Sequence, residues 1–168
     1  MGAWLAALPW MVLAIAVPLL GALAVFLRPR HAAPIGLSFA FLTAGAALCV
    51  LLDFIAWGTQ HHQAGGWGAP LGIDLVADGL SVLMLGMTAI VGTAVSVYAR
   101  VYLAAHPDKV RRFWPLWLFL WAALNALFQA GDVFNIYVTL ELLGLSAVAL
   151  GAWTGSGPAL WGAMRYLL

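Results

Sequence analysis

Long apolar stretches are the feature that most restricts the fold of this chain. A helix needs about 20 apolar residues to cross the roughly 30 Å hydrocarbon core of a bilayer. Stretches of this kind occupy Leu8–Leu27, Pro34–Trp57, Gly79–Leu103, Phe113–Ala130 and Val133–Ala152, and a further helix begins at Pro158. Lipid offers the backbone no hydrogen-bond partners, so such segments cross as helices. The sequence predicts an all-α, polytopic transmembrane helix bundle, with about five full spans and the start of a sixth.

The composition agrees with a chain that lies in the lipid bilayer. Of the 168 residues, 65% are hydrophobic and 8% are charged. A soluble domain must present a polar exterior to water, so this balance is typical of an integral membrane protein. We expect residues 1–168 to form a single integral membrane domain with no soluble part. The net charge of +1 carries no information about nucleic-acid binding, but no basic run is present to bind phosphate, so we expect no nucleic-acid partner.

Basic residues alternate between the predicted connections. The first and third connections hold Arg28, Arg30, Arg100, Lys109, Arg111 and Arg112. The second connection and the Gly131-Asp132 break contain no Lys or Arg. The positive-inside rule therefore predicts an N-terminus outside and basic connections in the cytoplasm, across a prokaryotic cytoplasmic (inner) membrane. Because no basic residue precedes the first apolar run, we expect a retained span rather than a signal peptide.

The segments between the spans suggest a hairpin-like external loop and two helix caps. The sequence LGIDLVADG alternates apolar with small or polar residues before the third span, which favours a short strand or hairpin. Asp78 and Asp132 each precede a predicted helix and are suited to N-capping. Five tryptophans lie near predicted span ends, as in an interfacial aromatic belt: Trp4, Trp10, Trp57, Trp114 and Trp153. Adjacent His61 and His62 lack the spacing of a metal site, and we expect no metal, cofactor or catalytic residue.

Glu141 is the only glutamate in the chain, and it lies near the middle of the fifth predicted span. A charged residue at the centre of a membrane helix costs about 2.5–3.5 kcal/mol on insertion scales. Burial raises the pKa of such a carboxyl group, which would let it exchange protons near neutral pH. Two interpretations remain open: a proton relay, or a carboxylate neutralised by a cation that only stabilises helix packing.

Arg165 is a candidate partner for Glu141. On antiparallel helices, Glu141 lies roughly 18 Å and Arg165 roughly 10 Å from the turn that joins them. A long side chain or a bridging water can span that offset. A cation nearby would favour the charged carboxylate and oppose the effect of burial. The alternative is that Arg165 extends its charge toward the membrane surface.

Three amide side chains could form a polar path. Asn125 and Gln129 are four residues apart, so they share one face of the fourth predicted helix. Asn135 lies at the start of the fifth helix. Each could line a hydrated path, but hydrogen bonding between helices is the commoner role.

Two segments resemble a known family. GIDLVADGLSVLMLGMTAIVGTAVSVYA resembles the entry to the third helix of the antiporter-like subunits shared by respiratory complex I and Mrp-type cation/proton antiporters. FWPLWLFLWAALNALFQAGDVFNIYVTLELLGLSAVAL is similar to the fourth and fifth helices of that family, with the pattern GD-x-FN-x-YV-xx-EL. The D-type Mrp protein is the most similar, followed by the N and M types of complex I. The resemblance runs from Gly66 onward, more weakly over the first two spans, and concerns the N-terminal portion of such subunits.

The resemblance implies roles for particular residues. Glu141 matches a glutamate that the family uses in proton translocation. Arg165-Tyr166 matches a basic residue followed by an aromatic one, although the family usually has Lys there. Arginine holds its proton more firmly than lysine, so an electrostatic role fits Arg165 better than proton release. Thr139-Leu140 replaces a bulky aromatic pair.

The resemblance also implies a function, with alternatives. The implied function is a membrane subunit of an Mrp-like cation/proton antiporter that moves protons and a monovalent cation together with other membrane subunits. One alternative is a membrane-arm subunit of an NADH:quinone oxidoreductase or membrane hydrogenase, in which case the chain would be a proton-pumping part of an enzyme. The other is a non-conducting scaffold subunit.

Overall fold

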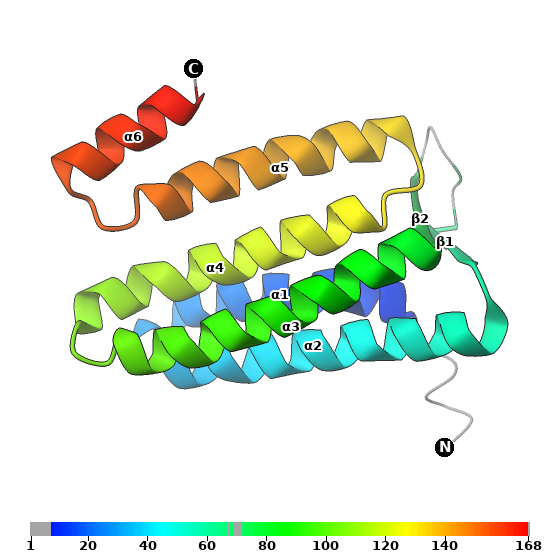
Figure 1. Cartoon of the computed structure of the whole chain (residues 1–168), viewed down its shortest axis with the longest axis horizontal. Helices are drawn as coiled ribbons and strands as arrows, with labels where there is room; N and C mark the ends of the chain where they lie inside the picture. The colour runs from blue at the N-terminus through cyan, green and yellow to red at the C-terminus, as the bar shows by residue number, and fades with distance from the viewer. Residues whose placement is uncertain (1–7, 67, 69–71, 168) are drawn as a thin grey trace.

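The computed structural model describes residues 8–66, 68 and 72–167, which form an elongated bundle of antiparallel helices with a small hairpin at one end (Figure 1). The helices are α1 (Trp10–Leu27), the short η1 (Pro29–His31), α2 (Ala32–Trp57), α3 (Gly79–Tyr102), α4 (Pro107–Phe128), α5 (Val133–Gly151) and α6 (Gly157–Leu167). The strands are β1 (Gln60–Ala64) and β2 (Ile73–Ala77). This arrangement confirms the expected helical membrane bundle.

Within the described residues, α1, α2 joined to η1, α3 and α5 are each long and apolar enough to cross a membrane. Together they make the protein an integral membrane protein. The fourth expected span corresponds to α4, which begins at Pro107 rather than at Phe113. Proline is well suited to the first turn of a helix, so the basic segment that sequence reasoning left in a loop is helical. These charges lower the mean hydropathy of α4.

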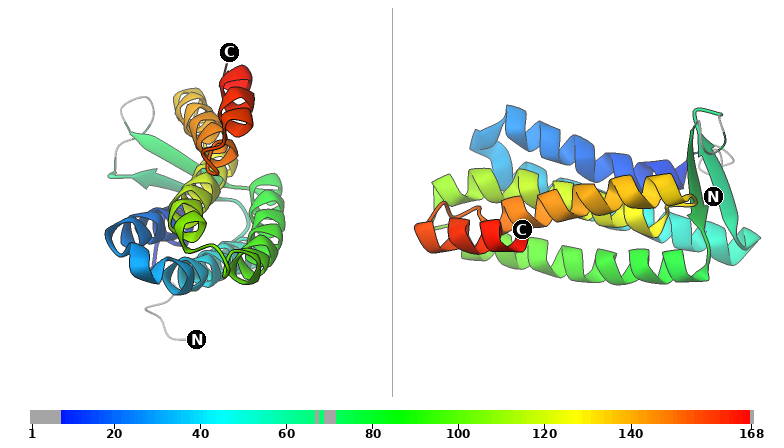
Figure 2. Two further views of the ribbon diagram at one scale, coloured as in Figure 1. Left: turned by 90° about the vertical axis from the view of Figure 1, so that its left-hand side faces the viewer. Right: turned by 90° about the horizontal axis from the view of Figure 1, so that it is seen from above.

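Helix α4 lies at the centre of the bundle, surrounded by α1, α2, α3 and α5 (Figure 2). Glycines let neighbouring helices approach its tryptophans closely. A Cβ at Gly92 of α3 would lie 2.7 Å from Trp121, and a Cβ at Gly36 of α2 would collide with Trp114. Trp114 is completely buried, so its expected place in an interfacial belt is wrong, and Trp4 of that belt lies outside the described residues. Small residues at helix contacts are typical of packing in membranes, where lipid provides no hydrophobic driving force between helices.

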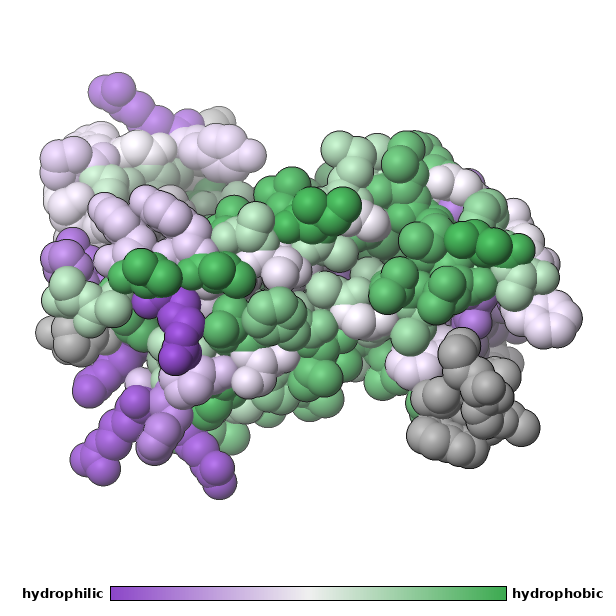
Figure 3. Space-filling view, turned by 60° about the horizontal axis from the view of Figure 1, so that its bottom comes forward, coloured by the Kyte–Doolittle hydropathy of each residue, from purple (hydrophilic) through white to green (hydrophobic). Residues whose placement is uncertain are grey.

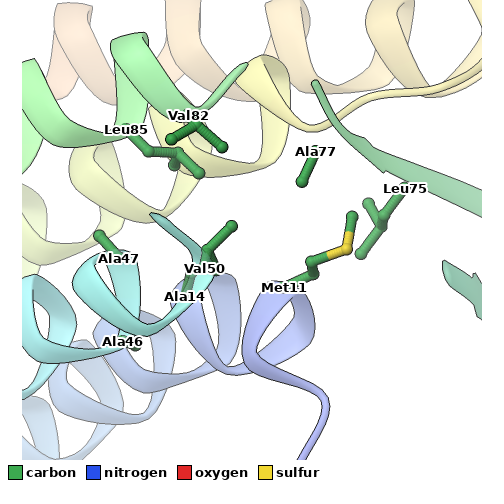
Figure 4. Close-up of a cluster of buried hydrophobic side chains, with 9 residues drawn as sticks. All are labelled: Met11, Ala14, Ala46, Ala47, Val50, Leu75, Ala77, Val82 and Leu85. Atoms are coloured by element: carbon green, nitrogen blue, oxygen red, sulfur yellow. The ribbon is translucent and has the colours of Figure 1, made fainter. Parts of the chain in front are cut away.

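The hairpin closes one end of the bundle. Strands β1 and β2 pair antiparallel, with Gln60 opposite Ala77 and Ala64 opposite Ile73. Two backbone hydrogen bonds of 2.8 Å, from Val76 N–H to Gln129 O and from Gly131 N–H to Asp74 O, attach the α4–α5 turn to β2. Leu75 and Ala77 of β2 point into an apolar cluster with residues of α1, α2 and α3 (Figure 4). The expected hairpin is therefore present and is anchored to the core.

Helices α5 and α6 form an outer layer on one side. Helix α5 packs on α4, and α6 packs on α5 (Figures 1 and 2). Asp132 caps α5, because its Oδ1 accepts a 2.7 Å hydrogen bond from the Asn135 backbone N–H. Asp78 caps α3 in the same way through Ser81. Both expected caps are confirmed.

Candidate functional site

Glu141 lies in a groove between α5 and α6. The groove has a volume of about 390 Å³, and Tyr137, Leu140, Gly144 and Tyr166 are among the residues that line it with Glu141. Tyr137 precedes Glu141 by one helical turn, and its hydroxyl can hydrogen-bond to the carboxylate. Sequence reasoning did not name Tyr137 as a site residue, although its i, i+4 spacing from Glu141 was a signal for this pair.

The groove opens on the side of α5 that faces away from the bundle. Glu141 is exposed, and Tyr137 and Leu145 on the same side are 62% and 56% exposed. A Cβ at Gly144 would meet nothing within 4 Å. An apolar helix face with a carboxyl group in the middle is unfavourable against lipid tails. The described residues therefore leave Glu141 on a face that needs protein or water beside it.

Arg165 is exposed on α6 and does not line this groove. Its neighbour Tyr166 does. Within the described residues, no ion pair joins Glu141 to Arg165, so the direct contact considered from the sequence is not formed. The two residues are carried on adjacent antiparallel helices (Figure 1), and an electrostatic influence over a longer distance stays a prediction.

Asn125 and Gln129 lie inside the bundle on α4, and both are completely buried. Asn125 Nδ2 donates a 2.7 Å hydrogen bond to the Ala14 carbonyl of α1, and Gln129 Nε2 donates to the Asn125 carbonyl at 3.0 Å. Asn125 Oδ1 and Gln129 Oε1 have no partner in the described part of the chain. Asn125 thus stabilises packing between helices, while two acceptors remain available in the interior.

Asn135 belongs to the inward face of α5. It is 8% exposed, and its Nδ2 is buried without a partner among the described residues. Thr139 and Ser146 are buried on the same helix. Helix α5 therefore carries polar groups inward, where it packs on α4, and carries Glu141 outward. The structure places the amide side chains in the interior and leaves Glu141 separate from them.

Comparison with known proteins identifies the family. Residues 67–114 match the family model described as NADH-ubiquinone oxidoreductase (complex I), chain 5 N-terminus. The N-type subunit of the NADH-quinone oxidoreductase of Desulforudis audaxviator is 34% identical over 163 residues, which cover 94% of this chain and 32% of the relative. The D-type subunit of the Na(+)/H(+) antiporter of Bacillus subtilis is 30% identical, with 95% of this chain and 33% of the relative covered. This chain thus spans about a third of the length of these relatives.

Solved structures share the fold. A chain in the membrane-bound sulfane sulfur reductase, an archaeal respiratory membrane complex, has a TM-score of 0.84 and 25% identity, with 94% of this chain and 33% of that chain covered. A chain in the Mrp complex from Dietzia sp. has a TM-score of 0.79 and 24% identity, with 94% and 30% covered, a similarity that concerns the fold alone. Both the Mrp complex and an archaeal respiratory membrane complex therefore contain this arrangement of helices.

Proposed function

This chain belongs to the family of antiporter-like membrane subunits shared by Mrp-type cation/proton antiporters and respiratory complex I, and we propose that it serves as part of a cation/proton antiporter subunit. In this proposal Glu141 takes up and releases protons, and a monovalent cation moves in exchange. The conducting unit includes other membrane subunits. Relatives named as D-type subunits of Na(+)/H(+) and K(+)/H(+) antiporters support an antiporter over the other members of the family.

The observation that carries the proposal is the position of Glu141. It is the only glutamate of the chain, it lies in an apolar helix long enough to cross a membrane, and it opens into a groove with two tyrosines. Ionisable residues within membrane spans are costly and usually mark an ion or proton pathway. Tyrosine hydroxyls both donate and accept hydrogen bonds, so they suit a group that changes its protonation state.

The open face of α5 indicates that further membrane helices lie against it in the working assembly. Only 17% of the apolar stretch of α5 is buried within the described structure. An acidic group on that face becomes tolerable when further helices cover it and supply polar or basic side chains. This chain spans about a third of the length of its relatives. We therefore expect proton transfer only in an assembly that covers the groove.

The interior amides provide a second part of the proposed path. The unpartnered oxygens of Asn125 and Gln129, with the Asn135 amide, can bind water in the half of the bundle near the hairpin. Arg165 would act by electrostatics, because its guanidinium does not release its proton at physiological pH. With the basic connections on the cytoplasmic side of an inner membrane, the hairpin and the N-terminus face outside.

The test is Glu141→Gln in the assembled complex. Glutamine keeps the size and hydrogen-bonding capacity of the side chain but cannot carry a proton. We expect a loss of cation-dependent pH change of at least about tenfold, because acid-base groups of this kind typically contribute about 10²–10⁴-fold. The measurement uses a pH-sensitive dye in vesicles that contain the purified complex.

Glu141→Asp is the matched control, since it retains a titratable carboxyl group and should retain part of the transport. Recovery of all subunits on purification shows that each variant assembles. Unchanged transport in Glu141→Gln would reject the proton role and leave a non-conducting scaffold, whose deletion should dissociate the complex.

A respiratory function is the second candidate. The similarity to an N-type subunit of an NADH-quinone oxidoreductase and to a chain of an archaeal respiratory complex favours it. The two functions differ in the subunits that would accompany this chain. Co-purification of flavin- and iron–sulfur-containing subunits would support the respiratory function, whereas their absence, with intact cation/proton exchange, would support the antiporter.

A further inference from the structure

A second pocket lies at the end of the bundle opposite the hairpin. It has a volume of about 370 Å³ and is formed where η1 and the start of α2 meet the end of α3 and the start of α4. Three arginines line it: Arg30 of η1, Arg100 of α3 and Arg111 of α4. Hydrophilic side chains project from this end of the molecule, which lies on the left in Figure 3. The pocket is far along the bundle from the Gln129–Asn135 region and separate from the Glu141 groove.

The positive charge of the pocket is not neutralised by the described side chains. Arg30, Arg100 and Arg111 are exposed, and none of them forms an ion pair in the described part of the chain. No Asp or Glu is among the described lining residues. Guanidinium groups converging from separate elements repel one another, and an anion between them removes that repulsion. Their planar, forked donors match the oxygens of phosphate.

Trp114 forms part of the wall of this pocket. Trp114 lines the pocket and is 0% exposed, yet its indole Nε1–H has no hydrogen-bond partner in the described structure. Buried donors are nearly always satisfied, because an unsatisfied one costs about 1–3 kcal/mol. The ring is held firmly, since it packs directly on Gly36. With less than 1 Å² of accessible surface, the N–H is out of reach of a ligand in the pocket, so Trp114 contributes a fixed apolar wall.

The start of α2 adds a further attraction for anions. Ala32 and Ala33 line the pocket in the first turn of α2, and no side chain caps that helix. The Ala32 N–H already donates to the Pro29 carbonyl of η1, so the attraction comes from the helix dipole, which favours negative charge at this end. The remaining lining consists largely of alanine, proline and valine. The pocket therefore combines a positive rim with an apolar wall.

We propose that this pocket binds the phosphodiester headgroup of an anionic phospholipid. The headgroup phosphate contacts the three arginines, and the glycerol and the start of the acyl chains lie along the apolar wall, which includes the buried ring of Trp114. The location supports a lipid, because the pocket lies where the apolar spans end and the basic connections begin. Basic pockets between membrane helices on the cytoplasmic side bind anionic headgroups in this way.

The experiment measures lipid binding and does not depend on transport. The purified chain in a non-ionic detergent is titrated with dihexanoyl-phosphatidylglycerol, dihexanoyl-phosphatidylcholine and inorganic phosphate, by isothermal titration calorimetry. We expect phosphatidylglycerol to bind most tightly. The variant Arg30→Gln/Arg100→Gln/Arg111→Gln should lose at least about tenfold in affinity for it.

The matched control removes the same charge from the same end but outside the pocket. Arg28→Gln/Lys109→Gln/Arg112→Gln should keep its affinity for phosphatidylglycerol within about threefold. Each single pocket variant, Arg30→Gln, Arg100→Gln or Arg111→Gln, should weaken binding by a smaller amount while helicity by circular dichroism stays unchanged. These single variants keep the test valid if the triple pocket variant folds poorly.

Three results would overturn the proposal. Equal losses of affinity for phosphatidylglycerol in the two triple variants would mean that the lipid is attracted to the whole basic end and is not bound in the pocket. Equal affinity for inorganic phosphate and phosphatidylglycerol would assign the pocket to a free anion. Full binding in the triple pocket variant and in the single arginine variants would exclude the pocket.

Discussion

The α1–α4 part of the bundle is more deeply buried than the outer layer formed by α5 and α6. In the apolar stretch of α1, 33% of residues are buried, against 17% in α5. Tryptophans of α4 lie directly on glycines of α2 and α3, whereas Gly144 and Gly151 of α5 have open space where a Cβ would be. The α1–α4 part is closely packed, whereas the layer of α5 and α6 presents an open surface.

The difference separates structural from functional polar groups. In the packed part, the Trp117 indole N–H donates to Ser96 Oγ at 2.9 Å, which joins α4 to α3, and Asn125 joins α4 to α1. In the outer layer, Glu141 faces an open groove with no ion-pair partner in the described residues. Polar residues that hold helices together lie where packing is complete. Glu141, the residue proposed for proton transfer, lies on a face of α5 that the described residues leave uncovered.

Matched glycine substitutions give the largest expected effect. Gly36→Ala should destabilise the protein by about 1–3 kcal/mol, because the added methyl group overlaps the buried ring of Trp114. Gly144→Ala should be neutral or should stabilise α5 by up to about 1 kcal/mol, since alanine favours helix and nothing obstructs it. Thermal unfolding in detergent, followed by circular dichroism, provides the measurement. Equal effects at the two positions would remove the proposed contrast in packing.

Much of the fold was accessible from the sequence. The predicted third and fifth spans begin at Gly79 and Val133, as α3 and α5 do. Asp78 and Asp132 were recognised as caps because a side-chain acceptor before an apolar helix has a local physical role. The alternating pattern around Leu75 predicted β2. In each case the signal depends on residues close together in the chain.

Which face of each helix packs against its neighbours could not be predicted from the sequence in the same way. Inside a membrane both lipid-facing and protein-facing residues are apolar, so periodicity does not reveal which face of α5 packs on α4. The sequence placed Glu141 near the middle of a span but did not show that it faces outward. Trp114 looked interfacial from its position, yet it is buried because Gly36 on another helix leaves room for it. The proton and polar-path roles of Glu141, Arg165 and the amides stay predictions.

The Asp78 cap gives a smaller, pH-dependent effect in the packed part. Asp78→Ala should cost about 1 kcal/mol through loss of the N-cap of α3. The hydrogen bonds from the Ser81 backbone N–H and hydroxyl hold the pKa of Asp78 below its ordinary value. Because the folded-state pKa is lowered, this stabilisation is fully present above the ordinary pKa and is lost as the pH falls through the lowered one.

Asp78→Asn provides the control for that pH dependence, since asparagine caps a helix without titrating. The natural protein and Asp78→Asn should have similar stability at neutral pH, and the natural protein should become the less stable of the two in acid. Thermal unfolding as a function of pH measures the difference. A constant difference across the acid range would rule out the titration of this cap.

The smallest effect concerns the hydrogen bond between α1 and α4. Asn125→Leu removes the donor to the Ala14 carbonyl, and bonds of this kind between membrane helices contribute about 0.6 kcal/mol on average. Ser146→Ala is the counterpart in α5, where the hydroxyl bonds only to the Leu142 carbonyl of its own helix, so we expect no measurable change. Both variants are compared by unfolding in detergent. A greater loss in Ser146→Ala than in Asn125→Leu would mean that the outer layer, rather than the α1–α4 part, depends on its polar groups for stability.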